Sequence, residues 1–299
     1  MIARATGLIA GYALDQALGD PRRWHPVAGF GRVAGSLERR LYADSVGRGS
    51  VHVAILVGGT VALGAVSERK GPFVGTMLAT WAVLGGRSLD REAAAIGSLL
   101  DGGNLPDARR RLTHLVGRDP SSLTADEVAR AVVESVAENT SDAVVAPLFW
   151  GAVAGIPGLL GYRAINTLDA MVGHRSSRYE RFGKPAARLD DVANLIPARI
   201  AAALAAIAGP DRGGAVRAWR DDAAGHPSPN AGPVESAFAG ALGLRLGGTN
   251  VYGDRIEHRP VMGHGRPVAP GDIGPARRLA SRVGRGAALA AAVIALLRR

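Results

Sequence analysis

Apolar residues gather in runs that carry almost no charge. The runs are 2–18, 51–66, 73–86, 144–161, 192–209 and 287–297. A helix needs about 20 residues to cross the hydrocarbon of a bilayer, and these runs lie at or just below that length. Their glycine and alanine content also suits close helix packing in lipid. The pattern favours an all-α, polytopic integral membrane protein with about four to six membrane helices and long helical polar loops, rather than a soluble protein with alanine-rich core helices.

The spacing of the runs sets the expected organisation. Runs 51–66 and 73–86 flank a short charged turn and predict a membrane hairpin over 51–86. Residues 2–18 predict a retained first helix rather than a cleaved signal peptide. The remaining connections are long and polar, and we expect one membrane-embedded catalytic domain over 1–299. Its other parts are polar loops at 87–142, 162–191 and 210–286, and a C-terminal helix at 287–297.

The first of these polar loops is itself expected to be helical. Residues 89–100 and 125–138 have helix-forming composition, and Thr124 is placed to cap the second helix ahead of Asp126 and Glu127. Long polar segments on a membrane protein are where binding and catalytic residues are expected.

Composition excludes several classes of protein. The chain has no cysteine, which rules out disulfides, zinc fingers, iron–sulfur clusters and a thiol nucleophile. The net charge is +10, and Lys70 and Lys184 are the only lysines among 36 basic residues. The arginines are scattered and aromatic residues make up 5% of the chain, so we expect no nucleic-acid partner. The chain also lacks the P-loop, H-E-x-x-H and G-x-S-x-G motifs.

Three acidic residues recur at helical spacing before the run at 144–161. Glu134, Glu138 and Asp142 would form one stripe on a helix, with Asn139 beside it. Stacked like charges are unfavourable unless a cation or cationic ligand lies between them. The stripe is either a solvated helix face or a functional site at the mouth of a membrane segment.

A second polar set combines acids with cations. It comprises Asn166, Asp169, Asp190 and Asp191, with Arg175, Lys184 and Arg188 between or beside them. Carboxylates that hold Mg²⁺ and cations that neutralise phosphate are typical of Mg²⁺-nucleotide sites. A salt-bridged surface loop is the alternative.

Two more sets lie among turn residues. His226, Ser228 and Asn230 belong to the stiff, proline-rich loop HPSPNAG, and Asp20 and His25 lie near the N-terminus beside Pro21 and Pro26. A lone histidine is more often structural than catalytic. Each set therefore indicates a functional site only in combination with the other polar sets.

The combination of motifs resembles the cobalamin-biosynthesis membrane protein family of adenosylcobinamide-phosphate synthases (CobD/CbiB). The segments that carry the resemblance are DQALGDP (15–21), HPV (25–27), ESVAENTSDAVVAPLFW (134–150), YRAINTLDAMVGH (162–174), FGKPAARLDDVANLIPARI (182–200), HPSPNAG (226–232) and LGGTNVYG (246–253). They extend over nearly the whole chain, and their combination is far more specific than any one of them.

The resemblance implies a multi-pass enzyme of the cell (inner) membrane. Such enzymes join adenosylcobyric acid to aminopropanol or its O-phosphate with ATP and Mg²⁺, giving adenosylcobinamide or its phosphate. The amide is expected to form through an acyl phosphate. Expected partners are the corrinoid, the amine, membrane lipid, and either a second copy of the chain or other corrinoid-assembly enzymes.

The resemblance also implies roles for the polar residues. Asp169, Asp190 and Asp191 would hold Mg²⁺, while Arg175, Lys184 and Arg188 would hold phosphates. Glu134 or Glu138 would accept the amine proton, with Asp142 in the same catalytic set. The expected substrate-binding residues are Asp20, His25, Asn139, Asn166, His226, Ser228 and Asn230.

Membrane topology restricts how these residues can meet. If every apolar run crossed the bilayer, 162–191 would lie opposite the other polar loops. We therefore expect 144–161 and 192–209 to be broken or half-spanning helices, interrupted by Pro147, Pro157 and Pro197. The alternative function is a non-enzymatic relative, either a corrinoid permease, which would ordinarily show internal repeats, or a signalling protein.

Overall fold

The chain forms two compact units. The computed structural model describes residues 1–20, 25–117, 119–174, 176–252 and 255–298. Unit 1 comprises Met1–Gly85, Asp142–Pro197 and Ala287–Arg299, and unit 2 comprises Gly86–Ser141 and Ala198–Gly286. The expectation of a single catalytic domain over 1–299 stays a prediction.

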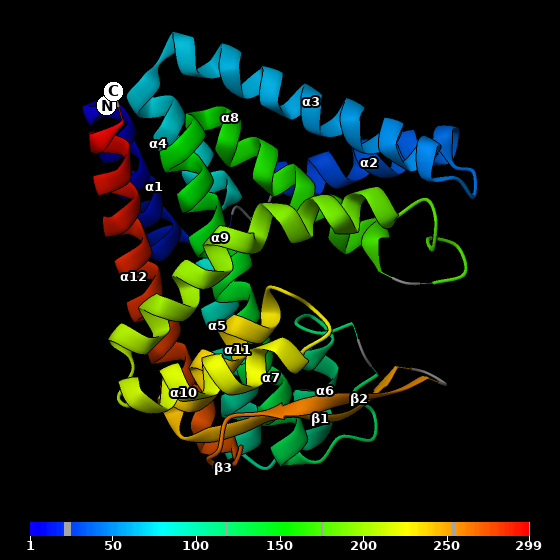
Figure 1. Ribbon diagram of the computed structural model, residues 1–299, viewed down its shortest axis with the longest axis vertical. Coiled ribbons are helices and arrows are strands. Elements are labelled where there is room, and N and C mark those ends of the chain that lie inside the picture. Colours follow the sequence, from blue (N-terminus) through cyan, green and yellow to red (C-terminus); the bar gives the residue numbers. More distant parts are fainter. Residues whose placement is uncertain (21–24, 118, 175, 253–254, 299) are drawn as a thin grey trace. The chain divides into compact units, whose positions relative to one another are not determined.

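Helices dominate both units (Figure 1). Unit 1 contains α1 (Ile2–Leu18), α2 (Pro26–Leu41), α3 (Val46–Lys70), α4 (Pro72–Val83) and α8 (Ala146–Leu168). Unit 2 contains α5 (Gly86–Asp101), α6 (Leu105–Leu112), α7 (Ala125–Thr140), α10 (Arg212–Asp222) and α11 (Ala231–Leu242). Helices α9 (Lys184–Ala208) and α12 (Ile273–Leu297) each contribute to both units.

Four helical stretches are long and apolar enough to cross a membrane. They are Val46–Lys70, Ala125–Gly173, Lys184–Ala208 and Pro270–Leu297. Large apolar side chains of α3, including Ile55 and Leu63, are exposed, as lipid contact requires. The prediction of a polytopic, all-α membrane protein is therefore confirmed.

Several predicted boundaries were wrong. The second arm of the hairpin, 73–86, is a helix of only 12 residues, Pro72–Val83, too short to span a bilayer. The predicted loop 162–191 overlaps two helices, because α8 extends to Leu168 and α9 begins at Lys184; its largely helical structure agrees with the expectation of helical polar loops. The C-terminal helix begins at Ile273 rather than at 287, since its arginines do not interrupt the helical backbone.

Glycines allow the helices of unit 1 to approach closely. Helix α4 packs along α1, where a Cβ at Gly7 would lie 2.8 Å from the Cβ of Thr76 (Figure 1). Helix α3 packs on α8, where a Cβ at Gly64 would lie 2.7 Å from the backbone of Pro157. Close backbone approach through small residues is the packing expected of membrane helices.

Helix α8 is irregular in the middle and is flanked by π-helical turns. Gly155 leaves helical geometry (φ 67°, ψ −148°), two residues before Pro157, so the predicted interruption is confirmed there. The interruption predicted at Pro197 was wrong, because α9 runs through this proline as one helix. The π turns are η1 (Ser141–Val145) and η2 (Asp169–Gly173). Such turns are rare and occur frequently at functional sites.

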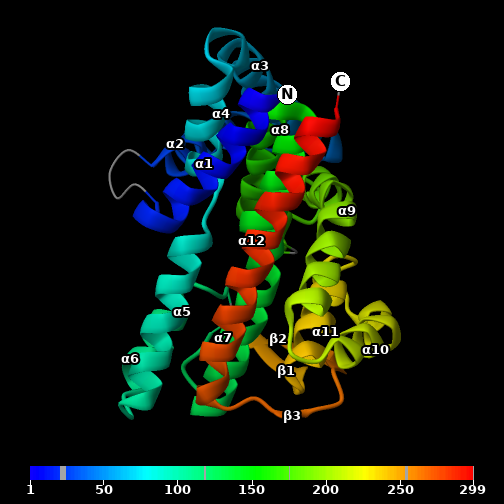
Figure 2. The ribbon, with the colours of Figure 1, turned by 90° about the vertical axis from the view of Figure 1, so that its left-hand side faces the viewer.

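Unit 2 is built around an apolar core. Side chains of α5, α6 and α7 pack together there, with contributions from the residues that follow α11. Figure 2 shows the ribbons of these three helices. Thr124 caps α7 as predicted, because its Oγ1 accepts a hydrogen bond from the Glu127 N–H at 3.3 Å and Glu127 caps in return.

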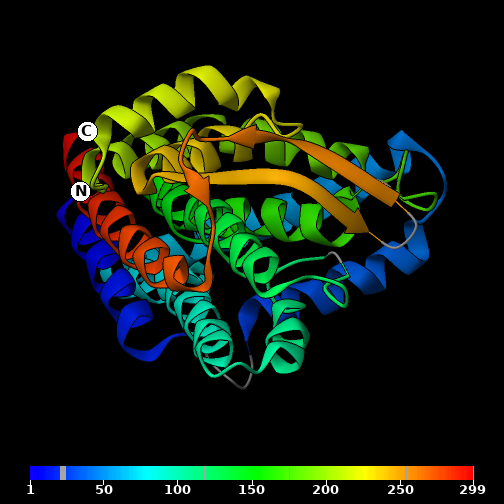
Figure 3. The same cartoon turned by 90° about the horizontal axis from the view of Figure 1, so that it is seen from below.

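A small sheet occupies part of the predicted polar loop 210–286. Strands β1 (Leu244–Tyr252) and β2 (Arg255–Met262) pair antiparallel, and β3 (Arg266–Pro267) pairs parallel with β1, giving the order β2-β1-β3 (Figure 3). A bulge lies between Leu246 and Gly248, and Gly247 and Gly248 have φ values of 84° and 96°. Nothing in the sequence pattern predicted these strands.

Candidate functional site

Unit 2 contains a cavity of about 770 Å³ next to the loop HPSPNAG. Arg199 of α9, Trp219 and Arg220 of α10, and His226 contribute its large polar and aromatic side chains. The rest of its lining is apolar, from Val216, Ala223, Ala224, Pro227, Pro229 and Pro233. A concave, mostly apolar wall with a few fixed polar groups is the ordinary form of a ligand site.

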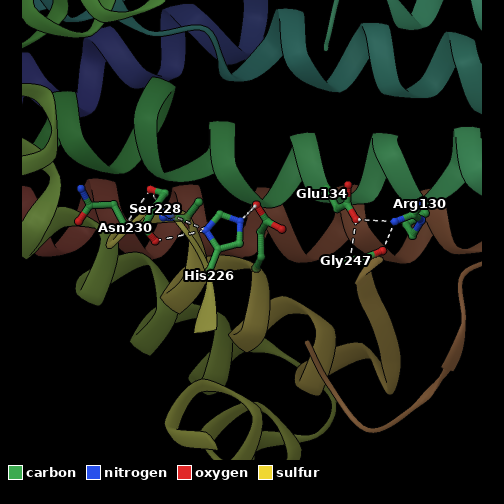
Figure 4. Close-up of polar contacts among 8 residues, drawn as sticks. Arg130, Glu134, His226, Ser228, Asn230 and Gly247 are labelled. Atoms are coloured by element: carbon green, nitrogen blue, oxygen red, sulfur yellow. Dashed lines mark hydrogen bonds and ion pairs between the residues drawn. The ribbon is translucent and has the colours of Figure 1, made fainter. Parts of the chain in front are cut away.

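The polar side chains of the loop are largely used to hold it in shape (Figure 4). Ser228 Oγ accepts hydrogen bonds from the N–H groups of Asn230 (3.3 Å) and Ala231 (3.1 Å) and thereby caps the start of α11. Asn230 Oδ1 accepts from Arg199 Nη1 at 2.9 Å. The loop therefore fixes the direction of Arg199 and presents His226 to the cavity.

His226 faces a buried carboxylate that the sequence analysis missed. Its Nε2 lies 3.8 Å from Glu235 Oε1, and the two side chains are only 3% and 1% exposed. His226 Nδ1 lies 3.0 Å from the Ser228 backbone nitrogen and 3.2 Å from the Ser228 carbonyl oxygen, so the loop itself holds the ring with Nε2 toward Glu235. A signal was present in the sequence, because Glu235 is the single charge in the apolar segment 231–242.

The three members of the acidic stripe have different surroundings. Glu134 is buried, and its Oε1 accepts from the Gly247 N–H at 2.9 Å and lies 3.6 Å from Arg130 Nη1 (Figure 4). Arg130 also donates to the Gly247 carbonyl. Glu138, one turn later, is exposed. Asn139 donates to the Ser135 carbonyl at 2.9 Å, and Asp142 belongs to unit 1, within η1.

In unit 1 the structure brings together part of the second polar set. Asn194 Nδ2 donates to Asp190 Oδ2 at 2.9 Å, and Asn166 Nδ2 to Asp190 Oδ1 at 3.5 Å. The Tyr162 hydroxyl lies 2.9 Å from Asn194 Oδ1 and 3.1 Å from the Asp142 carbonyl. Tyr162 and Asn194 are further members that the sequence analysis did not single out.

A family model described as CobD/Cbib protein matches residues 8–280. The chain belongs to this family. A cobalamin biosynthesis protein CobD of Mycobacterium tuberculosis is 51% identical over 304 residues, covering 99% of this chain and 97% of that protein. A cobalamin biosynthesis protein CobD of Rhodobacter capsulatus is 41% identical over 308 residues, covering 98% of each chain. These relatives support a role in cobalamin biosynthesis. No solved structure matches the chain.

The other residues that the resemblance to this family implicates are spread over unit 1. Asp20 Oδ2 lies 3.7 Å from His25 Nε2, and His25 Nδ1 accepts from the Val27 N–H at the start of α2. Lys184 and Arg188 are exposed on α9. The prediction for Arg175 falls outside the described residues.

The carboxylates expected to hold Mg²⁺ interact, but they are not gathered tightly around one point. Asp190 interacts electrostatically with Asp169 and with Asp191. Among the described residues, however, no group of three or more histidine, cysteine, aspartate or glutamate side chains is close enough to hold a metal ion. Mg²⁺ commonly uses only one or two carboxylates and takes its other ligands from water and phosphate, so Asp169 and Asp190 fit an ion carried by a nucleotide.

Proposed function

We propose that the chain is an ATP-dependent acid–amine ligase of the inner membrane. It joins adenosylcobyric acid to aminopropanol or aminopropanol O-phosphate, giving adenosylcobinamide or its phosphate. The observation that carries the proposal is family membership over residues 8–280, together with the near full-length similarity to cobalamin biosynthesis proteins. The four candidate membrane spans support a membrane-bound enzyme.

The proposed reaction has two displacement steps. A carboxylate oxygen of the corrinoid attacks the γ-phosphorus of ATP, and ADP leaves. The amine, once its ammonium form has lost a proton, attacks the carbonyl carbon of the acyl phosphate, and phosphate leaves as the amide forms. The protein must hold the phosphates, orient both substrates and accept the amine proton.

Glu138 is the better candidate for the proton acceptor. The carboxylate of Glu134 is buried and engaged by the Gly247 N–H and Arg130, whereas Glu138 is exposed one turn later on the same helix. Asn139 and Asp142 follow Glu138 closely along the chain and complete this catalytic segment.

Oxygen ligands and cations of unit 1 would serve the nucleotide. Asp169 and Asp190 would hold Mg²⁺, which shields phosphate charge when bound. Asp191 interacts electrostatically with Asp190, but the three described carboxylates do not form a metal-binding group. Lys184 and Arg188 are exposed cations that can reach phosphate oxygens. Asp20, His25 and Asn166 are proposed substrate contacts of unit 1.

The cavity of unit 2 would hold part of the corrinoid or amine substrate. His226 is the loop side chain that lines it, whereas Ser228 and Asn230 act by shaping the loop and fixing Arg199. Contact with a second copy or with other corrinoid-assembly enzymes belongs to the same proposal.

The test is amide formation by purified protein in detergent. Wild type with ATP, Mg²⁺, adenosylcobyric acid and aminopropanol phosphate should yield adenosylcobinamide phosphate and ADP. Glu138→Gln should lower kcat by about 100-fold or more, the usual contribution of a general base. Asp126→Asn, exposed on the first turn of the same helix, is the matched control and should retain wild-type turnover.

Two outcomes would contradict this assignment. Near-wild-type turnover of Glu138→Gln would remove the base role. Corrinoid uptake by vesicles, without any ATP-dependent product, would favour the permease.

A further inference from the structure

Unit 1 contains a guanidinium group, that of Arg163, whose hydrogen-bonding capacity is not met by its surroundings. Arg163 lies on α8, and its Nε is buried without a hydrogen-bond partner among the described residues. Its Nη1 reaches only Asn166 Oδ1, at the long distance of 3.4 Å. The residue as a whole is half-buried, so part of the side chain can still be approached.

No carboxylate within the described part of unit 1 forms an ion pair with Arg163. Asp20 and Asp142 interact with it electrostatically but lie beyond the 4 Å of an ion pair. Other arginines of the unit are paired closely, as Arg4 is with Glu68 at 2.8 Å and Arg178 with Glu38 at 3.1 Å. A charge withdrawn from water without a close partner is costly.

Arg163 lies on α8 two residues beyond the end of the apolar run 144–161. It is also one helical turn from Asn166 and next to Tyr162, both of which belong to the polar set around Asp190.

We propose that Arg163 binds an oxyanion of a substrate. A guanidinium presents a planar fork of donors that matches the two oxygens of a carboxylate or phosphate. The oxyanion is either a phosphate, from ATP or the phosphorylated amine, or the carboxylate of the corrinoid. The identity of the substrate rests on the proposed function, whereas the binding of an oxyanion at Arg163 does not.

Binding is measured first, by thermal unfolding in detergent. ATP, aminopropanol O-phosphate and adenosylcobyric acid are each added alone to wild type, Arg163→Met and Arg163→Lys. One of them should raise the Tm of wild type, with an affinity at least tenfold weaker in Arg163→Met and intermediate in Arg163→Lys. Arg40→Gln, an exposed arginine on α2, should bind as wild type does.

Stability without ligand separates binding from a structural role. Because Arg163 lacks a close counterion, Arg163→Met should unfold at or above the Tm of wild type. A fall of several degrees in both Arg163→Met and Arg163→Lys would overturn the proposal, since it would mean that the arginine supports the fold. The proposal would also be overturned if wild type and Arg163→Met bound each of the three compounds with the same affinity, or if wild type bound none of them.

Kinetics then identify the source of the oxyanion. In Arg163→Lys, the KM of one substrate should rise by about the factor by which its affinity falls, while the KM values of the other two stay unchanged. If wild type forms no amide yet an oxyanion still binds through Arg163, the proposed ligase fails and the Arg163 site stands.

Discussion

At the scale of single residues, similar acids on one helix have different surroundings. Glu134 and Glu138 are one turn apart on α7, so their spacing alone predicts the same role for both. The buried contacts of Glu134 with Gly247 and Arg130 bind the helix to the first strand of the sheet within unit 2. Burial and partners, rather than residue type, separate a structural acid from a candidate base.

Glu134→Ala should therefore destabilise the protein. The Gly247 N–H would lose its acceptor in a buried position, which costs about 1–3 kcal/mol of unfolding free energy. Thermal or chemical unfolding in detergent measures the loss. Glu138→Ala is the matched control, and equal stability of the two variants would contradict a structural role for Glu134.

Some residues of the candidate site could be predicted from the sequence and others could not. Asp190 and Asn166 were singled out by composition, and the structure joins them. Arg163 and Tyr162 were overlooked because the segment after residue 161 has the composition of a polar loop, when it continues α8 as a helix. Tyr162 meets Asn194 through a contact 32 positions apart, which no local pattern reveals.

At the scale of elements, α3 contains glycines that helix packing requires and glycines that it does not. Gly64 lies against the backbone of Pro157 in α8, so a side chain has no room there. A Cβ added at Gly58 or Gly59, earlier on the same helix, would have no neighbouring atom within 4 Å. The same residue type is therefore unconstrained by packing at those two positions.

Gly64→Ala should loosen the packing of α3 on α8. Overpacking of this kind costs about 1–3 kcal/mol, because the contact is with backbone that cannot rotate away. Gly58→Ala should be neutral or slightly stabilising, since alanine favours a helix by about 1 kcal/mol over glycine. Unfolding of both variants in detergent is the comparison, and a Gly64→Ala protein as stable as Gly58→Ala would refute this packing.

The helices were more predictable than the sheet for a physical reason. Long apolar runs and the Thr124 cap are local signals, and α3, α5 and α7 appear where those signals lie. The hairpin of β1 and β2 depends on a bulge and on two glycines with positive φ, Gly247 and Gly248. These glycines interrupt the sequence pattern of β1. That interruption removes the alternation by which strands are ordinarily predicted.

At the scale of the whole molecule, exposed apolar surface defines what the bilayer should cover. Ile55 of α3 and Val293 of α12 are about half exposed, at 51% and 54%, on helices long enough to span. By contrast, Ser177 lies exposed in the turn between η2 and α9.

Labelling single cysteines in a cysteine-free chain tests this surface directly. In intact membranes a water-soluble maleimide should leave Ile55→Cys and Val293→Cys unmodified until detergent is added, because lipid covers them. Ser177→Cys should react from the cytoplasmic side, where ATP is present. Reaction of Ser177→Cys from the outside only would contradict a half-spanning α8 and α9.

The two π turns also change how the long helical stretch must be read. Each turn accommodates about one residue more than an α-helical turn, and one residue corresponds to about 100° of rotation. A helical wheel drawn straight through 125–173 therefore loses its phase at η1 and again at η2. Asp142 and Asp169 lie at these two points, and Gly155 breaks the helix between them, so a single wheel does not place the residues of the successive parts on common faces.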